Sequence, residues 1–349
     1  MPSVDISSAF SFPTLERGYA VISEPSATST STGIASTTDG GGHWTVTVTE
    51  SAFAPFAGIA AVAFTTPDQG WAWAAEPTGT SSTPNLFSTS DAGRTWSAVP
   101  GISDVTDVLP LGESVWVLTD GTAGTRSVAG TPTATHLVVS NDGGATWRKA
   151  ESVVPAGAGM LSRVDTTTAY ALVGATLEET TDRGDQWSRA AGSRVPICPD
   201  AGNLNAPAQG DHFAATSLDS MWLICAGSAS AGSEEKTVYR SSNGGRTWTE
   251  VASVLDQPNP DVGNIPSFGY AFDGSLVAVS ATNAYFCLGR LGLIETSDGG
   301  RTWTVPINKY TDQCTIDMSS PKTGVVMLSH TNPTFWHTTN GVEWTPLPE

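Results

Sequence analysis

The side chains of this sequence that could do chemistry are mainly carboxylates, and five of them recur in one short pattern. The stretch SDGGRTW at 297–303 combines an aspartate, two glycines and a closing tryptophan, and six related stretches occur elsewhere. Such a loop is a candidate calcium site, but each copy offers one acid, whereas calcium needs several converging oxygens. We therefore favour a structural turn, in which the carboxylate accepts backbone N–H groups and a glycine supplies a positive φ angle. The third residues of the copies are Asp39, Asp91, Asp142, Asp182, Asn243, Asp298 and Asn340, and the closing residues are Trp44, Trp96, Trp147, Trp187, Trp248, Trp303 and Trp344.

The histidines and cysteines do not have the spacing of a metal site. The five histidines are scattered along the chain at His43, His136, His212, His330 and His337. None of the four cysteines forms a C-x-x-C pair, which argues against zinc binding and thioredoxin-like chemistry. We expect no metal and no cofactor.

The net charge of the chain argues against some classes of binding partner. The formal net charge is −18, so the chain lacks the basic footprint that nucleic-acid binding requires. Anionic membrane surfaces are disfavoured for the same reason, and neutral or cationic partners are favoured. No apolar run is long enough to span a membrane, and the N-terminus shows no secretion signal. Either the protein is cytoplasmic, or an export signal or anchor is not part of this sequence.

The spacing of the repeats indicates that they lie between β-strands. The closing tryptophans recur every 40 to 61 residues, the length of one four-stranded propeller blade with variable loops. An apolar hairpin with an aromatic-led second strand, such as AVAFTTPDQGWAWA, precedes each copy, although Val325 replaces the aromatic residue in the last. We predict an all-β, single seven-bladed propeller in which hairpin strands A and B precede strand C, the repeat turn and strand D. The predicted blades are 1–50, 51–103, 104–154, 155–192, 193–256, 257–310 and 311–349.

The repeat resembles a known motif. The pattern S/T-x-D-x-G-x-T-W is similar to the Asp-box of the bacterial neuraminidase-repeat superfamily, and its copies cover the whole chain. Similar boxes occur in sialidases, xyloglucanase-type glycoside hydrolases, sortilin ectodomains and the photosystem II stability/assembly factor family. The form FTTPDQGWAW followed by TSDAGRTW looks most like the last of these. The resemblance implies a propeller with the box in each C–D turn, but fold alone does not settle function.

The enzyme families within this resemblance fit less well. Sialidases place an Arg-Ile-Pro-type motif ahead of the first box and use three arginines, a Tyr–Glu pair and an acid Asp. Only Arg17 precedes Asp39 here, and Arg194-Val195-Pro196 follows the fourth box. Xyloglucanase-type enzymes pair two propellers, whereas we predict one. A glycosidase needs two carboxylates at a suitable separation, and the sequence leaves such a pair open.

The candidate binding face is the one that carries the B–C and D–A loops. The A–B turns and boxes are short and regular, whereas the loops at the opposite side vary in length, which is the usual layout of a binding surface. The alternatives are tolerated insertions and loop aromatics that form a small core of their own. We expect a collar of acids at the strand A starts, either attracting cations or merely solvated: Asp5, Asp104, Asp211, Asp273 and Asp312. The binding candidates are Asp211, Asp273, Phe56, Tyr270 and Phe272.

The four cysteines fall on the same predicted face. Cys225 and Cys287 occupy equivalent places near the end of strand B in units five and six, Cys198 lies before unit five, and Cys314 opens unit seven. We predict disulfides Cys198–Cys225 and Cys287–Cys314, although four buried free thiols remain the alternative. Disulfides would place the protein in an oxidising, extracytoplasmic compartment.

Together these observations favour a non-catalytic, extracytoplasmic binding or assembly scaffold. Its partner would be a protein or a glycan, bound at the face of B–C and D–A loops. The alternative is a glycoside hydrolase that uses paired carboxylates at the channel mouth. A hydrolase needs a walled pocket with converging carboxylates, whereas a scaffold needs only a broad exposed patch.

Overall fold

The computed structural model describes most of the chain, in two compact units. One unit comprises Met1–Ala156 with Leu347–Glu349, and the other comprises Gly157–Pro346. Apart from one 3₁₀ helix, η1 (Glu50–Phe53), the regular elements of the described residues are β-strands. The described residues are 5–25, 30–53, 56, 58–74, 83–120, 135–155, 160–196, 198, 212–230, 233–254, 263–264, 276–288, 292–308, 311, 313–329 and 333–347.

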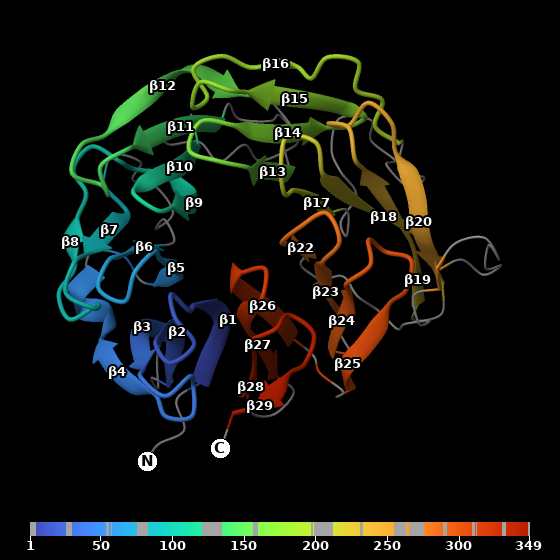
Figure 1. The fold of residues 1–349 in the computed structure, drawn as a ribbon. Helices are drawn as coiled ribbons and strands as arrows, with labels where there is room; N and C mark the ends of the chain where they lie inside the picture. Colours follow the sequence, from blue (N-terminus) through green and yellow to red (C-terminus); the bar gives the residue numbers. More distant parts are fainter. Residues whose placement is uncertain are drawn as a thin grey trace. The chain divides into compact units, whose positions relative to one another are not determined.

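The first unit contains three four-stranded sheets, each built from strands consecutive in sequence (Figure 1). Every neighbouring pair of strands is antiparallel. The strands are β1 (Asp5–Ser11), β2 (Gly18–Pro25), β3 (Thr30–Thr37) and β4 (Thr45–Val48); β5 (Ile59–Phe64), β6 (Gly70–Ala74), β7 (Leu86–Thr89) and β8 (Ser97–Ala98); and β9 (Val105–Leu111), β10 (Ser114–Asp120), β11 (Thr135–Ser140) and β12 (Arg148–Val154).

The second unit contains four sheets of the same kind. One of them has a fifth strand, β21, which pairs in parallel with β20. The strands are β13 (Met160–Arg163), β14 (Ala169–Val173), β15 (Thr176–Thr180) and β16 (Ser188–Arg189); β17 (His212–Ala215), β18 (Met221–Ser230), β19 (Ser233–Ser241), β20 (Thr249–Val254) and β21 (Gly263–Asn264); β22 (Leu276–Ala278), β23 (Ala284–Leu288), β24 (Gly292–Thr296) and β25 (Thr304–Asn308); and β26 (Gln313–Ser320), β27 (Thr323–Ser329), β28 (Pro333–Thr338) and β29 (Thr345–Pro346).

These seven sheets are the blades of a seven-bladed β-propeller, and the predicted fold class is confirmed. Each blade reads A-B-C-D in chain order. Within each unit the first strands of consecutive blades contact one another: β1 with β5, β5 with β9, β13 with β17, β17 with β22, and β22 with β26. Strand β21 was not expected, because it comes from the segment that follows blade five.

Within each unit, an aromatic residue in the second strand contributes to the contact between neighbouring blades, except in blade seven, which has Val325 at that position. The aromatic ring is buried, because strand B lies in the middle of its sheet and packs against the neighbouring blade. In four blades the polar tip of this residue donates to a backbone carbonyl of the following blade, whereas the buried Nε1 of Trp71 has no hydrogen-bond partner among the described residues. Tyr170 Oη donates to Leu218 O at 3.4 Å, and Trp222 Nε1 donates to Ser280 O at 3.1 Å. The remaining such bonds in the described residues are Tyr19 to Pro67 O and Tyr285 to Gly341 O.

Six of the seven outer edge strands have a feature that limits further strand pairing. Strands β8, β16 and β29 have two residues each, and the longer β12 pairs with β11 in an irregular register. Strand β25 contains Pro306, which lacks an N–H donor. In blade five the edge strand β20 is covered by β21.

Candidate functional site

The repeat turns satisfy their own polar groups, as the turn after β7 illustrates. Asp91 Oδ1 accepts the Thr95 N–H and the Thr89 hydroxyl, each at 2.9 Å, and Asp91 Oδ2 accepts the Thr95 hydroxyl at 2.6 Å. These bonds, led by the Thr95 hydroxyl, lower the pKa of Asp91 to about 2. The Trp96 Nε1 donates to Gly93 O at 3.1 Å, which closes the turn. The carboxylate is therefore a structural acceptor.

The other turns repeat this arrangement with small changes. Asp142 accepts the Thr146 N–H and hydroxyl, which lower its pKa to about 2. Asn243 keeps the bond from the Thr247 N–H, at 2.9 Å, and donates its own Nδ2 to the Thr247 hydroxyl, at 2.8 Å. Among the described residues no group of three or more His, Cys, Asp or Glu side chains could hold a metal ion.

At the other ends of the strands, polar side chains fasten one blade to the next. Asn85, which is fully buried, donates Nδ2 to Ala74 O at the end of β6 and accepts the Val105 N–H at the start of β9, each at 3.0 Å. Thr32 in β3 accepts the N–H of Ile59, the first residue of β5. These bonds fix the points at which the B–C and D–A segments leave the sheets.

Two disulfides strengthen the same side of the second unit. Cys198 bonds to Cys225 in β18, and Cys287 in β23 bonds to Cys314 in β26, with Cα–Cα distances of 5.1 and 5.3 Å. This is the predicted connectivity, and it leaves none of the four cysteines free. The second disulfide joins the end of strand B in blade six to the start of blade seven.

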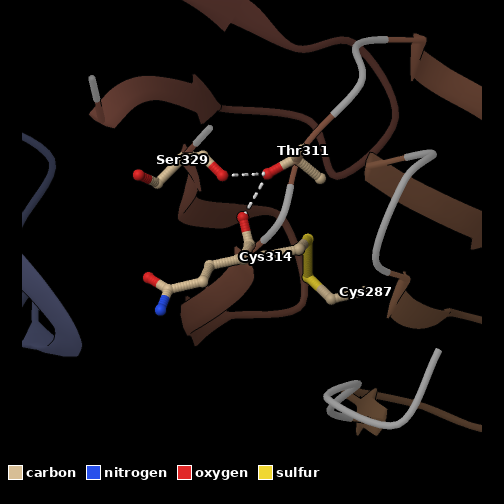
Figure 2. The surroundings of a disulfide bond; sticks show 5 residues. Cys287, Thr311, Cys314 and Ser329 are labelled. Atoms are coloured by element: carbon tan, nitrogen blue, oxygen red, sulfur yellow. Dashed lines mark hydrogen bonds between the residues drawn. A yellow bond between two sulfur atoms is a disulfide. The ribbon is translucent and has the colours of Figure 1, made fainter. Parts of the chain in front are cut away.

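A buried hydroxyl supports the second disulfide (Figure 2). Thr311 is fully buried, and its hydroxyl donates to the carbonyl oxygens of Gln313 and Ser329, the latter at 2.8 Å. It thereby ties the segment entering β26 to the end of β27. The sequence reasoning missed Thr311 and Asn85, whose only signal is a polar residue placed next to a strand end.

Most of the predicted binding residues lie outside the described residues: Asp211, Asp273, Tyr270, Phe272 and also Asp312. Asp5 is the first residue of β1, but its side chain is not described. Asp104 precedes β9 with φ of 57° and accepts the Ser103 hydroxyl at 3.2 Å. The acidic collar therefore stays a prediction.

Phe56 differs from its expected role. Its side chain is 3% exposed and packs edge-on against Phe87, with ring centroids 6.0 Å apart. Phe53 of η1 meets the same ring from another side, at 5.0 Å. The short helix turns both phenylalanines into the core between blades one and two, so Phe56 is not presented to a partner. The structure here supports the alternative interpretation, in which an aromatic loop residue is part of the core.

His212 is the first residue of β17, at the strand A start of blade five. Burial, followed by the nearby Lys236 ammonium, lowers the pKa of His212 to about 4, so the imidazole is neutral at pH 7. Its ring lies edge-on to Phe286 of the next blade, with centroids 5.9 Å apart. In blade three, burial raises the pKa of Asp107 in β9. Both groups belong to first strands.

The comparisons with known proteins support the fold. No protein-family model matches the sequence, and no curated protein sequence does. The chain is similar in structure to YCF48 bound to D1 peptide, at 18% identity and a TM-score of 0.57 over 97% of this chain and 93% of that one. YCF48 from Cyanidioschyzon merolae matches at 14% identity and a TM-score of 0.51, over 100% and 97% of the two chains. The chain therefore shares its overall fold with YCF48.

A third similar structure is an enzyme. An ancestral GH74 enzyme matches at 14% identity and a TM-score of 0.61, over 99% of this chain but 47% of that chain. All three identities are too low to carry a function, so the likeness concerns the fold alone. No helix in the described residues is long and apolar enough to cross a membrane.

Proposed function

We propose that the protein is a non-catalytic scaffold that binds an extended protein segment at the ends of its blades where B–C and D–A segments emerge. The observation that carries this proposal is that hydrogen bonds and disulfides hold the strand ends from which these segments emerge. Asn85, Thr311 and the two disulfides fix the exits of the variable segments. A surface whose loop ends are already held in place loses less conformational entropy on binding than a surface that must first become ordered.

The repeat-turn side offers less to a partner. Its turn carboxylates are already engaged by hydroxyl and N–H donors of their own turns. The side with variable segments instead holds loops of different length on a regular frame, which is how binding surfaces on repeat folds are usually built. YCF48, which shares the fold, has been seen bound to D1 peptide, and this supports a peptide-like partner.

The net charge and the disulfides indicate the charge of the partner and the compartment in which binding takes place. A protein of net charge −18 attracts cationic segments over long range and repels acidic ones. Two disulfides persist in oxidising compartments, so we place the scaffold outside the cytoplasm. We also assign the repeat turns to the Asp-box class, because Thr, Asp, Gly and Trp play fixed roles in them. A glycan is the second ligand class to be tested.

The test measures binding to a panel of basic, neutral and acidic peptides by biolayer interferometry. We expect the basic peptides to bind most tightly, with an affinity that falls as salt is raised. Asp211→Asn and Asp273→Asn should weaken that binding. The matched control is Glu113→Gln, which removes one charge from an A–B turn on the opposite side and should leave binding unchanged. Equal loss in the control, or preference for acidic peptides, would overturn the proposal.

The second candidate function is glycoside hydrolysis. It is favoured by the fold shared with the ancestral GH74 enzyme and by the acids predicted at strand A starts. The two proposals separate in one experiment, a glycan array read beside chromogenic glycosides. Turnover that is abolished by Asp211→Asn or Asp273→Asn would replace the scaffold proposal, since a glycosidase depends on two carboxylates. Binding without turnover supports the scaffold.

A further inference from the structure

Two of the repeat turns contain asparagine followed directly by glycine. These pairs are Asn243–Gly244 and Asn340–Gly341, at positions where the other five turns carry aspartate. Glycine has no Cβ, so in such a pair its backbone nitrogen can approach the side-chain amide carbon of the asparagine. This makes both pairs chemically prone to deamidation, and asparagine is among the thermolabile residues of proteins. The two turns differ in the exposure of the asparagine, in the partner of the glycine N–H and in the strand that follows.

The turn of blade five is held firmly. The N–H of Gly244 donates to Asp219 O in the neighbouring hairpin at 3.0 Å, so the attacking nitrogen is engaged outside its own turn. Asn243 is only partly exposed, and its amide is bonded to Thr247 through both Oδ1 and Nδ2. The strand that follows, β20, has six residues and pairs with both β19 and β21.

The turn of blade seven has as many bonds of its own, since Asn340 Oδ1 accepts the Val342 and Glu343 N–H groups and Nδ2 donates to Glu343, but the strand that follows it is shorter. The turn itself is one residue shorter than the other turns, and Asn340 is exposed. The N–H of Gly341 donates to the Thr338 hydroxyl at 2.9 Å, within the same turn. The strand that follows, β29, has two residues and pairs with β28 alone. Segments with few backbone bonds open locally at low cost, so this turn opens more often than that of blade five.

We propose that Asn340 is a site of spontaneous deamidation, and that its isoaspartyl product loosens the joint between blades six and seven. In the open turn the Gly341 nitrogen attacks Asn340 Cγ, and a new N–Cγ bond forms. The Cγ–Nδ2 bond breaks, and ammonia leaves with the amide proton. Water then opens the cyclic imide at either carbonyl, which gives an aspartyl or an isoaspartyl residue at position 340.

The two products have different structural consequences. An aspartyl residue fits the turn, because five sister turns are built on aspartate. An isoaspartyl residue adds one carbon to the backbone directly before Gly341. The Gly341 carbonyl accepts the Tyr285 hydroxyl of blade six at 2.7 Å, and Trp344 Nε1 donates to Glu295 of the same blade at 2.9 Å. The longer backbone displaces both contacts.

The first test follows the two sites in one sample of the intact protein. The folded protein is aged in warm, mildly alkaline buffer, and peptide mapping measures deamidation at each site. Because reaction from an open state tracks the population of that state, we expect position 340 to react on the order of tenfold faster than position 243. A sample aged in urea, where both turns are open, should show similar rates at both sites. Equal rates in the folded protein, or a faster position 243, would overturn the proposal.

The second test examines the joint itself. Protein deamidated at position 340 is separated from intact protein by ion exchange, its isoaspartyl content is measured by peptide mapping, and hydrogen exchange of β28 and β29 is compared with that of fresh protein. Faster exchange is expected. The matched control is Asn340→Asp, which gains the same charge without the extra backbone carbon and should exchange as the fresh protein does. Unchanged exchange in the isoaspartyl form, or equally fast exchange in the control, would contradict the proposed loosening.

Discussion

At the scale of single residues, Glu295 shows how a buried acid joins two blades. It lies in β24 with 4% of its surface exposed, and one carboxyl oxygen accepts the Trp344 Nε1. Burial raises its pKa from 4.5 to about 7, and the Trp344 bond only partly offsets this. The equivalent Glu179 of blade four instead accepts the Tyr170 hydroxyl, at 3.0 Å. The sequence identified Trp344 as a repeat residue, but not this partner, because the contact spans two blades.

The raised pKa of Glu295 determines how the contribution of this residue to the stability of the protein changes with pH. The folded state holds the Glu295 proton more tightly than the unfolded state, so this contribution to stability is full below about pH 4.5 and is lost as pH rises through about 7. Glu295→Gln keeps the shape and an acceptor oxygen without the charge. We expect this variant to be more stable than the parent by on the order of 1–3 kcal/mol at pH 8, and nearly equal at pH 5.

Urea unfolding of both proteins at the two pH values measures this difference. Glu113→Gln, at an exposed position, serves as the control and should not change the pH dependence of stability. A Glu295→Gln variant that is less stable than the parent at pH 8 would show that the ionised carboxylate is stabilising, contrary to the argument from burial.

At the scale of elements, the hairpin of blade two depends on a close approach between a glycine and a ring. A Cβ added to Gly70, at the start of β6, would lie 2.5 Å from the Phe64 ring. That ring is itself fixed, since it stacks on Tyr19 with centroids 3.5 Å apart and meets Trp96 edge-on at 5.9 Å. We expect Gly70→Ala to destabilise the protein by about 1–3 kcal/mol through overpacking.

A double-mutant cycle separates overpacking from a general backbone effect. Phe64→Leu removes the ring, so Gly70→Ala should cost less in that background than in the parent, as measured by urea unfolding. Additive costs would mean that the ring is not the obstacle. Gly101→Ala is a useful comparison, because nothing lies within 4 Å of the added Cβ and its cost reflects the φ of +78° alone.

The strands themselves were largely predictable, for local reasons. Each aromatic-led hairpin and each turn around Asp91 or its counterparts is specified within a few residues of sequence. Strand β21 was not predictable, because two residues, Gly263 and Asn264, pair in parallel with a strand about ten positions earlier and carry no apolar pattern. Phe56 was misjudged for a related reason: the turn of η1 that directs it into the core leaves no periodic signal.

At the scale of the whole molecule, seven copies of one turn predicted seven blades, and the disulfide partners followed from equivalent places in those blades. The residues of the candidate binding site were less predictable. Repeats specify the frame, whereas Asp211, Asp273, Tyr270 and Phe272 lie in segments that differ from blade to blade, so no internal comparison constrains them. Asn85 and Thr311, which bind neighbouring strand ends together, likewise lie outside the repeated turns.

The most direct test of the central claim, that the scaffold binds through the side where the variable segments emerge, is hydrogen exchange with and without the tightest-binding basic peptide. We predict protection at the first residues of strands such as β9 and β26 and at the last residues of β6 and β23. The repeat turns around Asp91 and Asp142 should exchange as before. Protection centred on those repeat turns, with the opposite strand ends unchanged, would contradict the claim.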